Sequence, residues 1–321
     1  MIQLREIGKT DVLVSSIGLG CMGMSEFYGP TNDEQSAKTL ERAAELGSTL
    51  WDTSDAYGIN SHNERLLAGI LKTQRDKIFV ATKFGFVRNK DNEFTGVSGS
   101  PEYVREAFAK SQKRLGVDLV DLYYQHRVDA NVPIEETVKA MAELVNEGRV
   151  RFLGLSECSA ETLKRAHKVH PIAAVQIEYS PWSLDIETNG LLDTARELGV
   201  SIIAYSPLGR GFLTGAIKNV LFLAFFPENF DKNIKLVDGI TALATKKGVT
   251  PSQYVLAWIL AQGPEFIVIP GTRRVKYLEE NAKAGEIVLS KEEVAEMRDL
   301  INNADTIGNR YFPAFLSLVN I

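Results

Sequence analysis

The stretch Ile78-Phe79-Val80-Ala81-Thr82-Lys83 is a short apolar run that ends in a charged side chain. Its apolar residues are nearly continuous rather than alternating, which is typical of a parallel strand buried on both faces of its sheet. Seven similar runs recur along the chain, centred on residues 17–19, 49–51, 119–124, 152–155, 173–177, 202–205 and 266–269. We therefore expect eight parallel strands.

The segments between these runs have the period of an amphipathic helix. Ile134, Val138, Met141 and Leu144, for example, fall on one stripe of a helix because they are three or four residues apart. Glycine readily adopts the positive φ found just past a helix, and it follows five of the segments, at Gly47, Gly116, Gly148, Gly199 and Gly248. Capping-box patterns at residues 250–253 and 290–293 predict the starts of further helices.

Repeated strand–helix units in one undivided chain predict an α/β fold, a (β/α)8 TIM barrel that forms a single domain over residues 1–321, with extra C-terminal helices. Residues 3–7 and 12–14 flank a turn and predict a short N-terminal β-hairpin. The alternative is a doubly wound sheet, because Gly18, Gly20 and Gly23 match the pattern G-x-G-x-x-G. The barrel is favoured, since no acidic residue closes a following strand about 20 residues further on.

Composition excludes several classes of function. The chain has 36 Lys and Arg against 41 Asp and Glu, a net charge of −5, which argues against a general nucleic-acid binder. Two cysteines, Cys21 and Cys158, make no disulfide framework, and no Cys, His or Asp spacing predicts a metal site. The first residues show no targeting pattern, and the longest apolar run, residues 220–227, is too short to span a bilayer. We expect a cytoplasmic protein with no membrane partner.

Polar side chains follow several of the predicted strands. Asp52 and Lys83 come directly after apolar runs, and Tyr57 lies five residues beyond Asp52. His126 follows the run at 119–124, after Gln125. The carboxyl ends of barrel strands meet at one rim, so these four side chains should converge. Buried charges are costly unless they are paired, which predicts an Asp52–Lys83 pair within a proton-transfer site.

These residues belong to a longer series of motifs. The series comprises residues 52–58 (Asp-Thr-Ser-Asp-Ala-Tyr-Gly), 63–64 (Asn-Glu), Lys83, 121–126, 154–156, Gln176, 204–209 and 269–272. In this order the motifs resemble the aldo-keto reductase superfamily over residues 8–281, in particular its microbial and plant branch. The resemblance implies a (β/α)8 barrel that reduces aldehydes or ketones with a nicotinamide cofactor, and a catalytic tetrad of Asp52, Tyr57, Lys83 and His126.

The resemblance gives each member of the tetrad a role in an NADP-dependent alcohol dehydrogenase or carbonyl reductase. Tyr57 would donate the proton to the carbonyl oxygen, and we expect the Lys83 ammonium to lower the pKa of its phenol. Asp52 would keep Lys83 charged, and His126 would position the carbonyl through a hydrogen bond. The rival is a Schiff-base role for Lys83, which needs a neutral, unpaired amine.

The resemblance also implies NADPH as the cofactor. Ser156 and Gln176 would bind the carboxamide, Tyr205 would stack on the nicotinamide, and Arg273 would meet the 2′-phosphate. Glu157 stands where the family often has Asn. The full set of residues expected to bind the cofactor is Gly20, Cys21, Met22, Asp52, Ser156, Gln176, Tyr205, Ser206, Pro207, Leu208, Gly209, Arg210, Gly211, Gly271, Thr272, Arg273, Tyr277, Glu280 and Asn281.

Two questions stay open at this point. The potassium-channel β-subunits of the superfamily bind NADPH as redox-sensing regulatory subunits, and their tetrad motifs do not distinguish them from reductases. The apolar segment at residues 220–226 is expected to cover the substrate pocket or a subunit contact, with a bulky apolar substrate as a corollary. The oligomeric state and the physiological aldehyde or ketone are not predicted.

Overall fold

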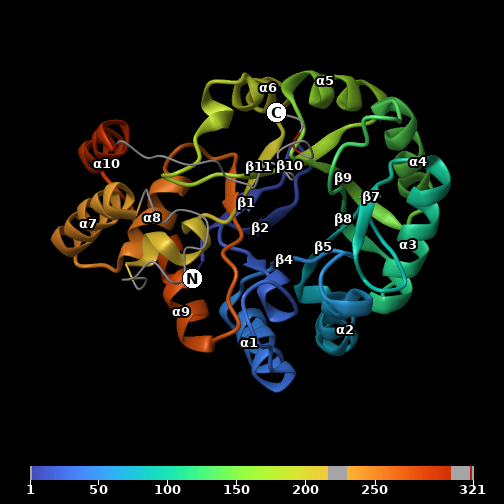
Figure 1. Cartoon of the computed structure of the whole chain (residues 1–321), viewed down its shortest axis with the longest axis horizontal. Coiled ribbons are helices and arrows are strands. Elements are labelled where there is room, and N and C mark those ends of the chain that lie inside the picture. The colour runs from blue at the N-terminus through green and yellow to red at the C-terminus, as the bar shows by residue number, and fades with distance from the viewer. Residues whose placement is uncertain (1, 216–229, 305–318, 320–321) are drawn as a thin grey trace.

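Parallel strands form a central ring in the computed structural model, which describes residues 2–215, 230–304 and 319 (Figure 1). In these residues the ring has eight strands, in the order β3 (Leu19–Gly20), β4 (Leu50–Asp52), β5 (Phe79–Phe84), β8 (Val120–Gln125), β9 (Val150–Ser156), β10 (Ile172–Glu178), β11 (Ser201–Tyr205) and β12 (Phe266–Val268). Parallel bridges from Ile17 to Val268 and from Gly20 to Gly271 join the first strand to the last. The ring is therefore closed, and the predicted barrel is confirmed.

Helices surround this ring, as Figure 1 shows. They are α1 (Asp33–Leu46), α2 (His62–Gln74), α3 (Pro101–Leu115), α4 (Ile134–Asn146), α5 (Ala160–Val169), α6 (Leu191–Leu198), α7 (Phe230–Lys247), α8 (Pro251–Leu260), α9 (Val275–Lys283) and α10 (Lys291–Asn303). The capping boxes predicted at Thr250 and Ser290 are present at the starts of α8 and α10. None of the helices that the structure describes is long and apolar enough to cross a membrane.

The predicted N-terminal hairpin pairs β1 (Leu4–Glu6) with β2 (Leu13–Ser15) and closes one end of the ring. Ile7 and Val14 are fully buried and pack with the side chains that fill the barrel interior. Arg5 donates hydrogen bonds to the backbone oxygens of Gly263 and Phe266, at 2.6 and 2.5 Å. The hairpin therefore anchors the amino ends of the strands and leaves the carboxyl ends for the site.

The glycines that suggested a dinucleotide-binding turn have another use. A Cβ atom on Gly18 would lie 2.6 Å from the backbone oxygen of Leu50, and one on Gly20 would lie 2.7 Å from that of Ile269. Both glycines therefore allow close contact between neighbouring backbones where the ring closes. The doubly wound alternative is wrong because these residues belong to a closed barrel.

A second hairpin, β6 (Phe86–Arg88) with β7 (Phe94–Val97), was not predicted from the sequence. It follows β5 and reverses through a polar turn in which Asn92 has φ of 65°. The strands are short and largely outside the core, so their apolar pattern is weak. The hairpin nevertheless matters for the site, because it brings Phe86 against His126.

Candidate active site

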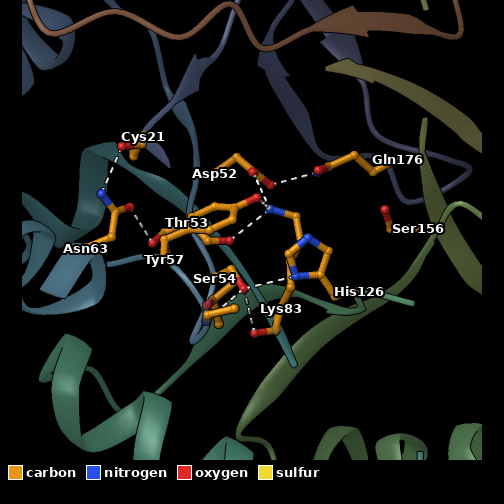
Figure 2. A network of polar contacts seen from close by, with 12 residues as sticks. Cys21, Asp52, Thr53, Ser54, Tyr57, Asn63, Lys83, His126, Ser156 and Gln176 are labelled. Carbon is orange, nitrogen blue, oxygen red and sulfur yellow. Dashed lines mark hydrogen bonds and ion pairs between the residues drawn. The ribbon is translucent and has the colours of Figure 1, made fainter. Parts of the chain in front are cut away.

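The carboxyl ends of neighbouring strands bring the four predicted side chains together (Figure 2). Asp52 ends β4, Lys83 lies on β5, His126 follows β8, and Tyr57 lies in the loop after β4. All four are buried, Lys83 completely and Tyr57 with 9% of its surface exposed. The structure thus places the predicted tetrad at one point on the rim of the barrel.

Lys83 is the centre of the hydrogen bonds in this cluster. Its Nζ donates to the carboxylate of Asp52, to the backbone oxygen of Thr53 at 2.9 Å and to Tyr57 Oη at 3.1 Å. An ammonium has three hydrogens to donate, and three acceptors are present. Gln176 Nε2 donates to the other Asp52 oxygen at 2.7 Å, so the carboxylate is held from two sides.

Charge and burial act against each other at Lys83. Burial alone would lower the pKa of its ammonium, but Asp52 and Tyr57 outweigh burial, so its pKa is raised. Burial raises the pKa of Asp52, and the charge of Lys83 opposes that rise. Lys83 therefore remains an ammonium near neutral pH, as the Asp52–Lys83 pair predicts.

The expected effect of Lys83 on Tyr57 is present, but the net shift of the Tyr57 pKa has the opposite sign. The charge of Lys83 does favour the phenolate, yet burial of the ring outweighs it, and the pKa of Tyr57 is raised above its ordinary value. Asp52 adds to the rise, because a nearby negative charge disfavours a second one. Tyr57 therefore holds its proton firmly until another group accepts it.

His126 is a neutral imidazole in this environment. Burial lowers its pKa well below the ordinary value, and the charges of Lys83 and Arg127 lower it further. Its Nδ1 lies 3.1 Å from Ser54 Oγ, and its ring meets those of Phe86 and Tyr57 edge to face, at centroid distances of 4.7 and 5.7 Å. The imidazole is therefore fixed in place and carries one ring hydrogen.

Several residues that support the site were given no role from the sequence. Ser54 and Phe86 contact His126, as described above. Asn63, part of a quoted motif, donates to the backbone oxygen of Cys21 at 2.8 Å and accepts from Thr53 Oγ1 at 2.7 Å (Figure 2). Asn63 thereby ties the loops after β3 and β4 together. Its place next to the tetrad motif was the available signal.

The residues expected to contact the nicotinamide lie on or directly after strands β9 to β11, which follow β8 around the ring. Ser156 ends β9 and Gln176 lies on β10, both buried. Glu157 is buried with φ of 50°, and its Oε1 accepts a hydrogen bond from the hydroxyl of Tyr205 at 2.8 Å. Glu157 therefore orients the aromatic ring that was predicted to stack on the cofactor.

The segment expected to wrap a pyrophosphate has an unusual backbone. Ser206, Gly209, Arg210 and Gly211 all have positive φ, between 49° and 93°. Glycine adopts this conformation easily, whereas other residues rarely do. The chain here bends tightly after β11, at the rim that holds the tetrad.

The segment expected to bind the 2′-phosphate begins where Gly271 pairs with Gly20. Arg273 is half-buried and donates to the backbone oxygens of Gly29 and Pro30, at 3.2 and 2.6 Å. The other three residues expected to bind the cofactor in this segment differ in exposure. Tyr277 is exposed and Asn281 is buried, and Glu280 accepts a hydrogen bond from Thr250 Oγ1 at 2.7 Å. Glu280 is thus engaged at the start of α8.

A cavity of about 530 Å³ lies at the opposite end of the barrel, lined by residues such as Arg75, Phe79 and Asp121 near the amino ends of strands. Catalytic groups of barrels lie at the carboxyl ends, so we assign the site to the rim with the tetrad. Among the residues that the structure describes, no group of three or more His, Cys, Asp or Glu side chains could hold a metal ion. The segment at 220–226 lies outside the described residues.

Comparison with known proteins identifies the class to which this barrel and its site belong. The family model described as "Aldo/keto reductase family" matches residues 16–302. The chain is 51% identical to aldo-keto reductase str7 from Strobilurus tenacellus, covering 95% of this chain and 94% of that protein. It is 45% identical to aldo-keto reductase yakc [NADP(+)] from Schizosaccharomyces pombe, covering 97% and 95%. The chain therefore belongs to the aldo/keto reductase family, as its motifs indicate.

Solved structures agree with this assignment. A glycerol dehydrogenase from Gluconobacter oxydans superposes with a TM-score of 0.86 at 26% identity, covering 97% of this chain and 98% of that one. The holo form of an aldo-keto reductase from Bacillus halodurans superposes with a TM-score of 0.81 at 26% identity, covering 96% and 98%. The chain is thus an oxidoreductase of this family by sequence and by fold.

Proposed function

We propose that this protein reduces an aldehyde or ketone to the alcohol, with NADPH as hydride donor and Tyr57 as proton donor. The observation that carries the proposal is the 3.1 Å hydrogen bond between Lys83 Nζ and Tyr57 Oη, inside a cluster completed by Asp52 and His126. The S. pombe relative carries NADP(+) in its name, which supports the choice of cofactor. The chain would act as one domain.

The residues present fit a dinucleotide phosphate. Gly20 and Gly271 lie side by side at the rim, and without a Cβ their backbones come close together there. The bend at residues 206–211 contains four residues of positive φ, and Arg273 provides a guanidinium that matches phosphate geometry. When bound, NADPH supplies the hydride that reduces the carbonyl carbon.

The side chains of this chain account for the proton and for the position of the carbonyl. As negative charge develops on the carbonyl oxygen, Tyr57 transfers its proton to that oxygen and becomes a phenolate. Lys83 stabilises the phenolate through the hydrogen bond that it already makes, and Asp52 keeps the ammonium charged. Neutral His126 donates a hydrogen bond to the same oxygen, which orients the carbonyl.

Two alternatives are less well supported. A Schiff-base role for Lys83 needs a neutral amine, whereas its three hydrogens all meet acceptors. A regulatory role, in which NADPH stays bound, is compatible with the tetrad, and only a measurement of multiple turnover distinguishes it from a reductase.

Cys21 and Cys158 are both buried and free, which favours a reducing compartment such as the cytoplasm.

The test is the substitution Tyr57→Phe, assayed as NADPH consumption with a panel of aldehydes. The ring is kept and one hydroxyl is lost, so reduction should fall by about 10²–10⁴-fold while NADPH binding, followed by fluorescence, is unchanged. Tyr254→Phe is the matched control, because that hydroxyl donates to the backbone oxygen of Glu293 on the outside of the barrel. Full turnover in Tyr57→Phe would contradict the proposal, and no turnover in the wild type would favour the regulatory role.

A further inference from the structure

The hydroxyl of Ser54 lies among four polar atoms next to His126. Ser54 is fully buried. Its Oγ is 3.1 Å from the backbone nitrogen of Ala56, 3.1 Å from His126 Nδ1, 3.3 Å from Asp55 Oδ1 and 3.4 Å from the backbone oxygen of Lys83. Figure 2 shows the hydroxyl between the imidazole and the loop after β4. The direction of one hydroxyl hydrogen therefore decides the hydrogen-bond pattern around His126.

The possible patterns can be counted. A hydroxyl has one hydrogen to donate and two lone pairs, and the Ala56 N–H takes one lone pair. If His126 Nδ1 accepts the hydroxyl hydrogen, the neutral imidazole carries its own hydrogen on Nε2. If Asp55 accepts it instead, His126 must donate from Nδ1 to Ser54, and Nε2 has no hydrogen. The two tautomers of His126 thus correspond to two directions of the Ser54 hydroxyl.

The geometry favours the first direction. His126 Nδ1 is the nearest of the three possible acceptors. The backbone oxygen of Lys83 is the furthest, and it already accepts from the Asp55 N–H at 3.1 Å. A protonated Asp55 would complete this arrangement, because its own hydrogen would occupy the second lone pair of Ser54.

We propose that Ser54, which lies between Asp55 and His126, is a positioning residue that holds His126 in the tautomer with its hydrogen on Nε2. The inference rests on the proposed function, in which His126 donates a hydrogen bond to the substrate carbonyl. With Nδ1 turned to Ser54, that donor has to be Nε2. An ionised Asp55 would attract the Ser54 hydrogen through a charge-assisted bond and leave Nε2 as an acceptor facing the carbonyl oxygen.

The surroundings of Asp55 keep it protonated near neutral pH. Burial, followed by the charge of Glu64 on α2, raises the pKa of Asp55 to about 8. Arg114 on α3 and Lys83 on β5 oppose this rise, as does the Ser54 hydroxyl. Within residues 2–215 and 230–304, Asp55 also interacts with the phenols of Tyr103 on α3 and Tyr123 on β8.

This arrangement predicts a pH dependence of defined sign. Below pH of about 8, Asp55 is protonated and His126 can donate from Nε2. As the pH rises through that value, Asp55 ionises, the tautomer changes and kcat/KM for carbonyl reduction falls. Ionisation of Tyr57 lies at higher pH, because its pKa is raised above the ordinary value of 10. The two ionisations are therefore separable.

The decisive measurement is the ¹⁵N NMR spectrum of the histidines in the full chain, with His126 assigned from the spectrum of His126→Gln. The wild type should show the Nε2–H tautomer of His126 at pH 7 and the Nδ1–H tautomer above about pH 9. Asp55→Asn should keep the Nε2–H tautomer throughout, because its amide donates to Ser54 at every pH. Ser54→Ala should lose the preference and lower kcat/KM by about tenfold, the loss expected for one hydrogen bond.

Kinetic profiles give the second readout. The fall in kcat/KM near pH 8 should disappear in Asp55→Asn and persist in Asp193→Asn, a matched control on the exposed face of α6. An Nδ1–H tautomer at pH 7, or the same alkaline profile in Asp55→Asn as in the wild type, would overturn the proposal. Because the tautomer is measured without substrate, an inactive protein would contradict the proposed function while leaving the test of Ser54 intact.

Discussion

Removing the buried charge of Lys83 should destabilise the fold far more than removing a surface charge. The Lys83 ammonium is fully buried and donates to Asp52, Thr53 and Tyr57. Lys83→Met keeps an unbranched side chain and deletes all three bonds, which leaves the Asp52 carboxylate buried beside Gln176. Breaking a buried pair by removing one partner costs about 3–5 kcal/mol. We expect the free energy of unfolding to fall by that amount.

Urea unfolding at pH 7 measures this effect, and a second variant isolates its cause. Asp52→Asn combined with Lys83→Met removes both charges and keeps an amide oxygen for Gln176, so it should recover most of the loss. Lys246→Met is the matched control, since its pair with Glu296 is exposed and such pairs contribute about 0–1 kcal/mol. A loss below 1 kcal/mol in Lys83→Met, or a double variant no more stable than the single one, would refute the reasoning.

Two further predictions concern the cofactor and the barrel wall. Arg273→Ala should weaken NADPH binding by about 10–150-fold and leave NADH binding nearly unchanged, because a charge-assisted contact with the 2′-phosphate is lost. Fluorescence titration with both cofactors checks this, and equal losses would contradict it. Gly154→Ala should lower the free energy of unfolding by about 1–3 kcal/mol, since its Cβ would lie 2.4 Å from the ring of fully buried Tyr124. Gly69→Ala on α2, where a Cβ meets open space, is the control, and a similar loss there in urea unfolding would argue against crowding as the cause.

The parts of the fold that the sequence predicts correctly are those encoded locally. Each strand of the ring is a buried apolar run, and glycines such as Gly47 and Gly116 have the positive φ that ends a helix. The hairpin of β6 and β7 lacks such a signal, because its short strands gain their stability from each other and from neighbouring side chains. Arg88 illustrates this dependence, since it donates to Glu26, 62 residues away in sequence.

The convergence of Asp52, Tyr57, Lys83 and His126 could be predicted from the sequence, but the directions of their pKa shifts could not. Strand ends place Tyr57 near Lys83, which suggested a lowered pKa for the phenol. The direction of the Tyr57 pKa shift depends on how much water the fold removes from the ring, and burial outweighs the ammonium. Opposing effects of comparable size cannot be ranked from residue types alone, because each depends on distance and exposure.

The cofactor side shows a coupling that spacing alone does not reveal. Arg273 donates to the backbone oxygens of Gly29 and Pro30, in the loop after β3, more than 240 residues away in sequence. Both of these bonds come from Nη1, whereas a guanidinium has five N–H donors in a planar fork. Nη2 and Nε could therefore meet a phosphate while Nη1 stays on the loop, and charge-assisted bonds of this kind are roughly twice as strong as neutral ones. The expected preference for NADPH over NADH would then depend on an Arg273 side chain that the loop at residues 29–30 already orients.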